Sequence, residues 1–207
     1  IDKGLSEALM LRRAQCTIYL AQESDTLGKD SELASTLAQG KTVIAFVPTV
    51  DEEYVSKLLT ELKGDVTGED KRSIILGQLQ RFEPGAAWKD KVVRGWIDDP
   101  KSMDVETAEK RLQEKIAEHY NKRAETLKKS HPLGIQVNLE TGVANGVLVV
   151  RTVKECAQLV RRIVTRTLEF DLRDIDLNGS GYTALHEKIS DCVYRVVTKD
   201  VLLTNAF

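Results

Sequence analysis

The chain has 207 residues, of which 42% are hydrophobic and 30% charged, and its 30 Lys and Arg against 32 Asp and Glu give a formal net charge of -2. This length can bury a hydrophobic core, and the balanced charge produces no field that would favour nucleic acid or an anionic membrane. Because aromatic residues make up 5% and offer little for stacking on unpaired bases, we do not expect nucleic acid as a partner.

Cysteine usage and hydropathy indicate the compartment. Cys16, Cys156 and Cys192 show neither CxxC spacing nor a neighbouring His cluster, which predicts reduced thiols and no metal site. No apolar run approaches the roughly 20 residues that cross a bilayer, and no charged-then-apolar leader opens the chain. We therefore expect a soluble, cytoplasmic protein with no membrane partner. Because the chain starts with Ile1 and not Met, we also expect it to be a fragment.

The N-terminal quarter predicts a helix followed by a β-α-β unit. Residues 4–14 have apolar side chains at helical spacing: Leu5, Ala8, Leu9 and Leu11. Residues 16–21 and 42–48 are apolar and typical of strands, and residues 31–39 between them have helical spacing, with Gly40 as the expected stop. Two apolar strands around one short helix indicate a parallel sheet that is buried on both faces.

The middle of the chain predicts helices with one ambiguous stretch. A capping box that begins at Thr49 predicts a helix, and residues 72–82 fit either a helix or a buried strand. Residues 83–103 are interpreted as an insertion folded against the sheet or as a lid. Trp88 and Trp96 in this stretch either cover a base in a ligand pocket or pack in a core or interface.

A long amphipathic helix is predicted from Asp104, its cap, to about Lys129, with His131-Pro132 as the stop. Its inward side chains are Val105, Ala108, Leu112, Ile116, Tyr120 and Leu127. Packing along its own domain is favoured over pairing with a partner helix.

The C-terminal third predicts a smaller α+β region. Residues 134–150 are interpreted as a hairpin with its turn near Ala144-Asn145-Gly146, and residues 153–168 as a helix. Residues 176–183 read as a loop, and residues 192–198 as a strand.

The loop after the first expected strand carries the candidate site. Ligands of open parallel sheets bind beyond the carboxyl ends of the strands, where residues 22–30 begin. Asp30 or Ser31 can cap the following helix, and Glu32 falls in its first turn, where the helix dipole favours a carboxylate. Three polar residues share the side of Glu32 and would let it stay out of the core: Ser35, Thr36 and Gln39. Spacing alone fits a purely structural turn and cap equally well.

Two phosphate-binding motifs are excluded around Gly28. A Walker A loop needs a Gly five residues before Gly28 and a Ser or Thr two residues after it, but the chain has Glu23 and Asp30 there. Gly28 also stands alone, so the dinucleotide pattern GxGxxG is absent.

Several residue types recur in a specific order over residues 16–48. They are Ser24-Asp25-Thr26-Leu27-Gly28, then Glu32, Ala34 and Ala38, then Gly40-Lys41-Thr42-Val43-Ile44. This order resembles the nucleoside deoxyribosyltransferase-like and Toll/interleukin-receptor-like (TIR-like) superfamily, in which a loop with Ser, Asp and Gly leads into a helix with an active-site Glu. A Gly-Lys-Pro-Val-like segment then starts the next strand, and here Thr42 replaces the Pro.

The resemblance implies that Glu32 is the catalytic carboxylate, acting at the anomeric carbon of a ribosyl group as nucleophile or as stabiliser of an oxocarbenium-like transition state. It implies that Ser24 and Asp25 line the ribose pocket, with Gly28 and Ser31 also binding substrate, and that no metal or cofactor takes part. The implied reaction cleaves the N-glycosidic bond of NAD or a nucleoside. Many TIR-like proteins consume NAD and are activated by assembly or by a partner in bacterial defence, so a homo-oligomer or an activating protein partner is expected.

The expected fold is α/β, with a flavodoxin-like open parallel sheet, truncated at its N-terminus, followed by a long helix and a smaller α+β region. The expected domains are residues 1–100, which bind the nucleotide, and residues 101–207. The leading function is an NAD-cleaving N-glycosidase. The alternatives are a non-catalytic nucleotide-sensing or assembly module that uses the same crevice, and a scaffold that docks a partner through residues 104–129. The superfamily also uses the loop after its first strand, which would precede this chain.

Overall fold

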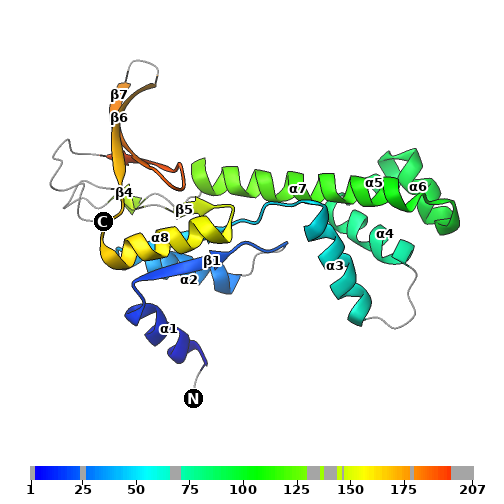
Figure 1. The fold of residues 1–207 in the computed structure, drawn as a ribbon, viewed down its shortest axis with the longest axis horizontal. Coiled ribbons are helices and arrows are strands. Elements are labelled where there is room, and N and C mark those ends of the chain that lie inside the picture. The colour runs from blue at the N-terminus through cyan, green and yellow to red at the C-terminus, as the bar shows by residue number, and fades with distance from the viewer. Residues whose placement is uncertain are drawn as a thin grey trace. The chain divides into compact units, whose positions relative to one another are not determined.

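A computed structural model describes residues 3–23, 27–65, 71–129, 136–137, 144–145, 147–177 and 180–196. The chain divides into two compact units, residues 1–48 with 123–207 and residues 49–122 (Figure 1). The predicted α/β class is confirmed, with an open parallel sheet, a long helix and a small antiparallel region. The division into residues 1–100 and 101–207 stays a prediction.

The parallel sheet has the strand order β1-β2-β5, with β1 at Cys16–Leu20, β2 at Thr42–Phe46 and β5 at Val147–Val150. Ile44 lies between Ile18 on one side and Leu148 on the other. Val43, Ile44 and Ala45 are fully buried, as are all four residues of β5. The predicted β-α-β unit is confirmed, because α2 (Leu27–Ala38) connects β1 to β2 and contacts both strands.

Strand β1 is less buried than predicted. Tyr19 is 4% exposed and its hydroxyl accepts a hydrogen bond from Arg123 at 2.9 Å, but the neighbouring Ile18 and Leu20 are 52% and 49% exposed. Side chains that alternate along a strand point to opposite faces. The expectation that both faces are buried therefore holds for β2 and β5, and it is wrong for the edge strand β1.

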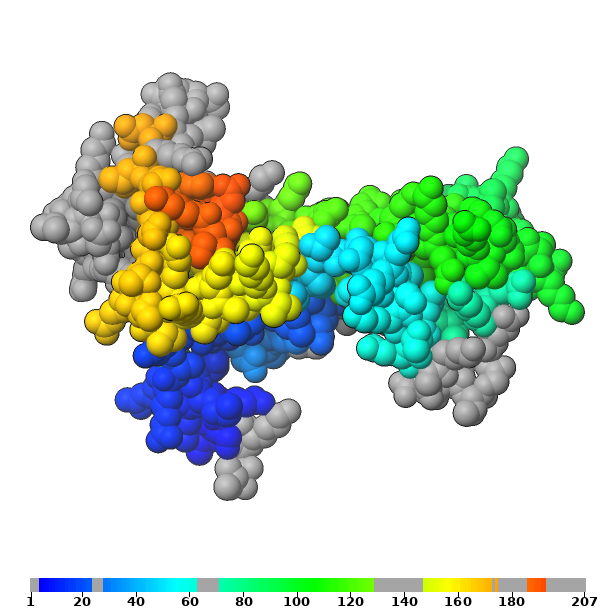
Figure 2. Space-filling model, viewed as in Figure 1, coloured from blue at the N-terminus to red at the C-terminus, as the bar shows by residue number. Residues whose placement is uncertain are grey.

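Helix α1 (Lys3–Arg13) forms as predicted, but its apolar stripe is not inward. Leu5 and Leu9 are 59% and 47% exposed, and α1 protrudes at the margin of its unit in dark blue (Figure 2). The helix is attached through its C-terminal end, where Lys41 Nζ donates hydrogen bonds to the carbonyl oxygens of Leu11 and Arg12, both at 2.8 Å. A cation at this end also complements the helix dipole.

The unit of residues 49–122 is helical. It contains α3 (Glu52–Asp65), α4 (Lys71–Phe82), α5 (Ala86–Lys89), α6 (Lys91–Asp98), the short 3-10 helix η1 (Pro100–Ser102) and the first part of α7 (Val105–Lys129). The ambiguous stretch 72–82 is therefore a helix. The capping box at Thr49 is wrong, because α3 begins three residues later and Asp51 caps it by accepting a hydrogen bond from the backbone N–H of Tyr54 at 2.8 Å.

Helix α7 confirms the predicted amphipathic pattern and its cap. The Thr107 hydroxyl and, at 3.3 Å, the Thr107 backbone N–H donate to Asp104 Oδ2, and the hydroxyl bond followed by the backbone bond lowers the pKa of Asp104. Five of the six predicted inward side chains are buried: Ala108, Leu112, Ile116, Tyr120 and Leu127. Val105, the sixth, is half-buried.

The C-terminal region contains α8 (Val153–Thr165) and two antiparallel ladders, β3 (Gln136–Val137) with β4 (Ala144–Asn145), and β6 (Phe170–Leu177), β7 (Ser180–Glu187) and β8 (Val193–Val196). The predicted helix over 153–168 is confirmed to Thr165, and the predicted strand at 192–198 is confirmed over Val193–Val196, with residues 197–198 outside the described residues. The predicted turn at Ala144-Asn145 is wrong, because these residues pair with Val137 and Gln136 and the chain then continues into β5 of the parallel sheet. Residues 176–183 are mostly strand, since β6 extends to Leu177 and β7 starts at Ser180.

None of the helices that the structure describes has the length and apolar character needed to span a membrane.

Candidate functional site

The candidate site lies where α2 follows the carboxyl end of β1. Helix α2 begins at Leu27, four residues earlier than predicted, so Gly28 lies in its first turn and not in a loop. The predicted cap at Asp30 or Ser31 is therefore wrong. Asp30 is the acid of the first turn, and Glu32 follows it in the second turn.

The remaining predicted substrate-binding residues are only partly described. Gly28 and Ser31 are exposed. Ser24 and Asp25 lie outside the described residues, so the ribose pocket predicted at these two positions stays a prediction.

The orientation of Glu32 follows from its neighbour one turn along. The Thr36 hydroxyl donates to the Glu32 carbonyl oxygen at 2.8 Å and lies 2.8 Å from the hydroxyl of Thr17 on β1. Thr36 is 1% exposed, so this side of α2 faces the sheet. Residues four apart lie on the same helix face, which places half-buried Glu32 on the sheet side, one turn nearer the start of α2. The expectation that Thr36 shares a solvent-facing side with Glu32 is wrong.

Two cations that the sequence analysis missed lie at the same edge of the sheet. Lys29 Nζ, from the first turn of α2, donates to the Leu20 carbonyl oxygen at 3.4 Å and to Gln22 Oε1, just beyond β1. Arg151 directly follows β5, and its Nη2 donates to the Pro48 carbonyl oxygen at 3.1 Å, just beyond β2. Burial lowers the pKa of the Arg151 guanidinium, although the nearby Glu155 carboxylate opposes this effect. A cation placed directly after an apolar strand is the sequence signal that could have found Arg151.

The carboxyl edge of the sheet thus combines Glu32 with two cations, Lys29 and Arg151, and the Glu155 carboxylate lies close to Arg151. Because β2 separates β1 from β5, the ends of the outer strands lie about 10 Å apart, two strand spacings. Cations at that separation can hold an extended anion such as a diphosphate. The Glu32 carboxylate can then stabilise a positive charge that develops on the same ligand. Within the described ranges, no three His, Cys, Asp or Glu side chains are placed to hold a metal ion.

Other polar features of the described residues have structural roles. The ring of His119 packs edge-on against Phe82 and Tyr120, with centroids 5.5 and 5.4 Å apart. The fully buried carboxylate of Glu187, which the sequence analysis missed, accepts hydrogen bonds from the backbone N–H groups of Ile189 and Ser190 at 3.0 and 2.7 Å. These bonds fix the turn between β7 and β8.

Two hollows that described residues line lie in the helical unit. The larger, about 540 Å³, lies among α3, α4 and α7, and the smaller, about 310 Å³, shares several of its residues. Lys71 and Glu109 line both and form an ion pair at 2.7 Å. Their opposite charges are paired at a partly exposed surface.

Comparisons with protein-family models, with curated proteins and with solved structures found no match to this chain. The functional argument therefore depends on the positions of Glu32, Lys29 and Arg151.

Proposed function

We propose that this protein is a nucleotide N-glycosidase that cleaves NAD to nicotinamide and ADP-ribose, with Glu32 as its catalytic carboxylate. The observation that carries the proposal is the position of Glu32. It lies in the first half of α2, which follows the carboxyl end of β1, and one turn before Thr36, whose hydroxyl contacts Thr17 of β1. Open parallel sheets bind their ligands at this edge.

The chemistry suits an ionised carboxylate. In NAD the nicotinamide ring carries a positive charge, so departure of neutral nicotinamide moves that charge onto the ribose, which becomes oxocarbenium-like. Glu32 would stabilise this charge or form a transient bond to the anomeric carbon, and one water molecule would complete the reaction by supplying the new hydroxyl and releasing one proton. Lys29 and Arg151 would hold the diphosphate.

The alternative is a nucleotide-sensing or assembly module. It is favoured by the same two cations, because Lys29 and Arg151 could hold the diphosphate of a nucleotide that the protein leaves intact. Activation by self-assembly or by a protein partner belongs to the proposal in either form. Assays should therefore cover a range of protein concentrations.

The decisive experiment follows release of free base from NAD and from common nucleosides by chromatography. Glu32→Gln should lower the rate by at least about 100-fold, the usual cost of removing a group that stabilises transition-state charge. Asp30→Asn is the matched control, because it makes the same change of acid to amide two residues away on α2, and it should retain activity. Thermal unfolding verifies that both variants fold.

Each other outcome has a defined meaning. Equal base release by wild type and Glu32→Gln would refute the catalytic role of Glu32. Absence of base release, together with a rise in thermal stability that grows with nucleotide concentration, would replace the enzyme with the sensor. Absence of both effects would remove nucleotide from the proposal.

A further inference from the structure

The corner between α5 and α6 exposes an unusual set of side chains. Trp88 is 70% exposed and Val92 is 55% exposed, although tryptophan is on average a highly buried residue. Lys89, Lys91 and Arg94 are also exposed. In the part of the chain that the structure describes, Trp88 is the exposed aromatic side chain, and it is surrounded in sequence by three cations.

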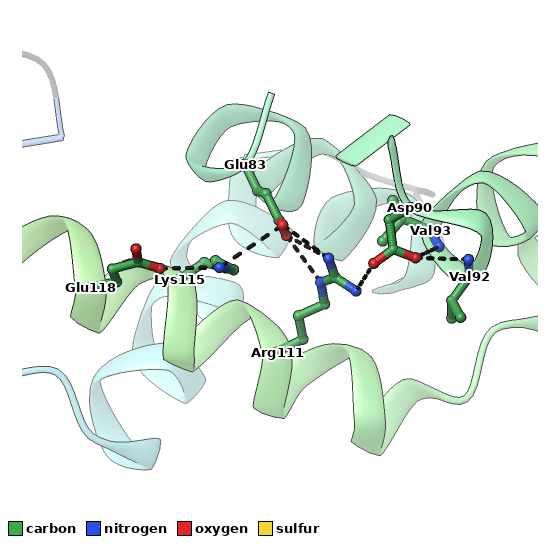
Figure 3. Close-up of polar contacts among 7 residues, drawn as sticks. All are labelled: Glu83, Asp90, Val92, Val93, Arg111, Lys115 and Glu118. Atoms are coloured by element: carbon green, nitrogen blue, oxygen red, sulfur yellow. Dashed lines mark hydrogen bonds and ion pairs between the residues drawn. The ribbon is translucent and has the colours of Figure 1, made fainter. Parts of the chain in front are cut away.

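Two acids of this corner, Glu83 and Asp90, are engaged by a helix of the same unit. Arg111 of α7 donates to both carboxylate oxygens of Glu83 at 2.8 to 3.0 Å, and its Nη1 donates to Asp90 Oδ2 at 2.7 Å (Figure 3). Asp90 Oδ1 accepts from the backbone N–H groups of Val92 and Val93 at 2.8 and 3.2 Å. Hydrogen bonds from Arg111 and from this backbone hold the pKa of Asp90 below its usual value, so the carboxylate stays ionised and occupied.

The exposed cations of this corner are available to pair with carboxylates of another molecule. Among the described residues, no carboxylate forms an ion pair with Lys89, Lys91 or Arg94. The corner therefore presents three exposed cations without an ion pair to a described carboxylate, and the exposed Asp98 lies one turn beyond Arg94 at the end of α6.

The corner is also held in shape. Val93 and Trp96 are 0% and 6% exposed and anchor the underside of α6, while Asp90 caps the first turn of that helix and is itself held by Arg111. Trp88 and Val92 thus have fixed surroundings. A surface that is ordered before binding loses less conformational entropy when a partner docks.

We propose that Trp88, Lys89, Lys91, Val92 and Arg94, named here the corner surface, dock an acidic segment of a partner protein. Apolar side chains of the partner would cover Trp88 and Val92, and its carboxylates would face the three cations. An apolar centre with a charged rim is the usual anatomy of a protein interface, and Trp and Arg are the residues that most often dominate binding energy. Single-stranded nucleic acid is disfavoured, because it binds to several stacking rings and this surface offers one.

The inference is independent of the glycosidase proposal, since no residue of the corner surface belongs to the Glu32 site. The sequence allowed either tryptophan to cover a base or to pack in a core or interface. Trp96 is buried in the core of its own unit, and Trp88 is not.

The test uses the full chain and a synthetic, fluorescein-labelled peptide with Glu and Leu at helical spacing. Peptide anisotropy reports binding, and the emission of Trp88 should shift to shorter wavelength as the ring is covered. Trp88→Ala and the double variant Lys91→Glu/Arg94→Glu should each weaken binding by at least about 10-fold. Lys57→Glu on α3 is the matched control, since it reverses another exposed charge of the unit and should bind as wild type. Higher salt should weaken the wild-type interaction.

Variant peptides and an oligonucleotide test which chemical groups the corner surface binds. A peptide with Lys in place of Glu and a peptide with Ser in place of Leu should both bind at least about 10-fold more weakly, because each lacks one half of the recognition. Equal binding by the Lys peptide, wild-type affinity in a folded Trp88→Ala, or failure of the Glu/Leu peptide to bind would overturn the proposal. Tighter binding of oligodeoxythymidine than of the peptide would replace the acidic protein with nucleic acid.

Discussion

Replacing Gly77 with alanine should raise the free energy of unfolding of the helical unit by about 1 kcal/mol. Gly77 lies inside α4, is exposed, and has open space where a Cβ would stand, with no atom within 4 Å. The substitution therefore adds neither a clash nor a buried contact. What remains is the intrinsic preference for alanine over glycine in a helix, which arises largely from the greater freedom of glycine in the unfolded chain.

Two further glycines test the same reasoning. Gly95 lies inside α6 and is also exposed with open space, so Gly95→Ala should stabilise by a similar amount. Gly40 follows α2 with φ 68°, a left-handed conformation that costs a residue with a Cβ about 1–2 kcal/mol. The same chemical change should therefore destabilise the protein at Gly40.

Urea unfolding provides the assay. Trp88 and Trp96 both lie in residues 49–122, so tryptophan emission follows that unit for the Gly77 and Gly95 variants. Far-ultraviolet circular dichroism follows the Gly40 variant, and a change of about 1 kcal/mol should move the urea midpoint by about 0.3–1 M, since m is about 1–3 kcal/mol/M for small proteins. A shift of the same sign at Gly77 and Gly40 would refute the reasoning, because Gly77 is helical and Gly40 has a left-handed backbone conformation.

Two other predictions concern ionisable groups. The pKa of Asp90 is lowered in the folded protein, so its contribution to stability is complete above the pKa of an unfolded Asp, about 3.9, and is lost as the pH falls through the folded-state pKa. Asp90→Asn should therefore lose less stability on acidification than wild type. Urea midpoints of the two proteins that fall in parallel down to acid pH would contradict this. Burial raises the pKa of the Cys16 and Cys192 thiols, and Cys192 is 2% exposed. A disulfide reagent at mild alkaline pH should therefore modify half-buried Cys16 first and Cys192 only on unfolding. Immediate labelling of both thiols in the folded protein would show that the region around Cys192 opens readily.

Elements with a long, regular apolar period were predictable from sequence. The stripe of α7 repeats over 25 residues, so single exceptions such as half-buried Val105 do not change the assignment. The start of α2 was not predictable in the same way, because Gly28 suggests a turn and Leu27 to Asp30 have no apolar period. At α3, Thr49 and Asp51 are both good caps, and only the backbone geometry distinguishes them.

The errors in the sheet and in the site have a common physical origin in pairing between distant residues. The sequence predicts a turn near Ala144-Asn145-Gly146, but Ala144 and Asn145 form β4, and this depends on where Val137 and Gln136 lie in space. The polar character of Thr36 suggested solvent, but its hydroxyl lies against Thr17 across the sheet interface. A cation directly after an apolar strand marks Arg151 as a candidate in the sequence, but its place at this edge depends on the pairing of β5 with β2.

The pairing of β2 with β5 has a consequence for synthesis of the chain. About 100 residues separate the end of β2 from the start of β5, and at a translation rate of about 5–20 residues per second the partner strand emerges roughly 5–20 s later. During that interval β1, α2 and β2 have left the ribosome while one edge of β2, with its apolar Val43, Ile44 and Ala45, has no strand to pair with. We therefore expect chaperones to bind the nascent β-α-β unit. The length of the helical unit encoded between β2 and β5 sets the time before β5 is available to pair.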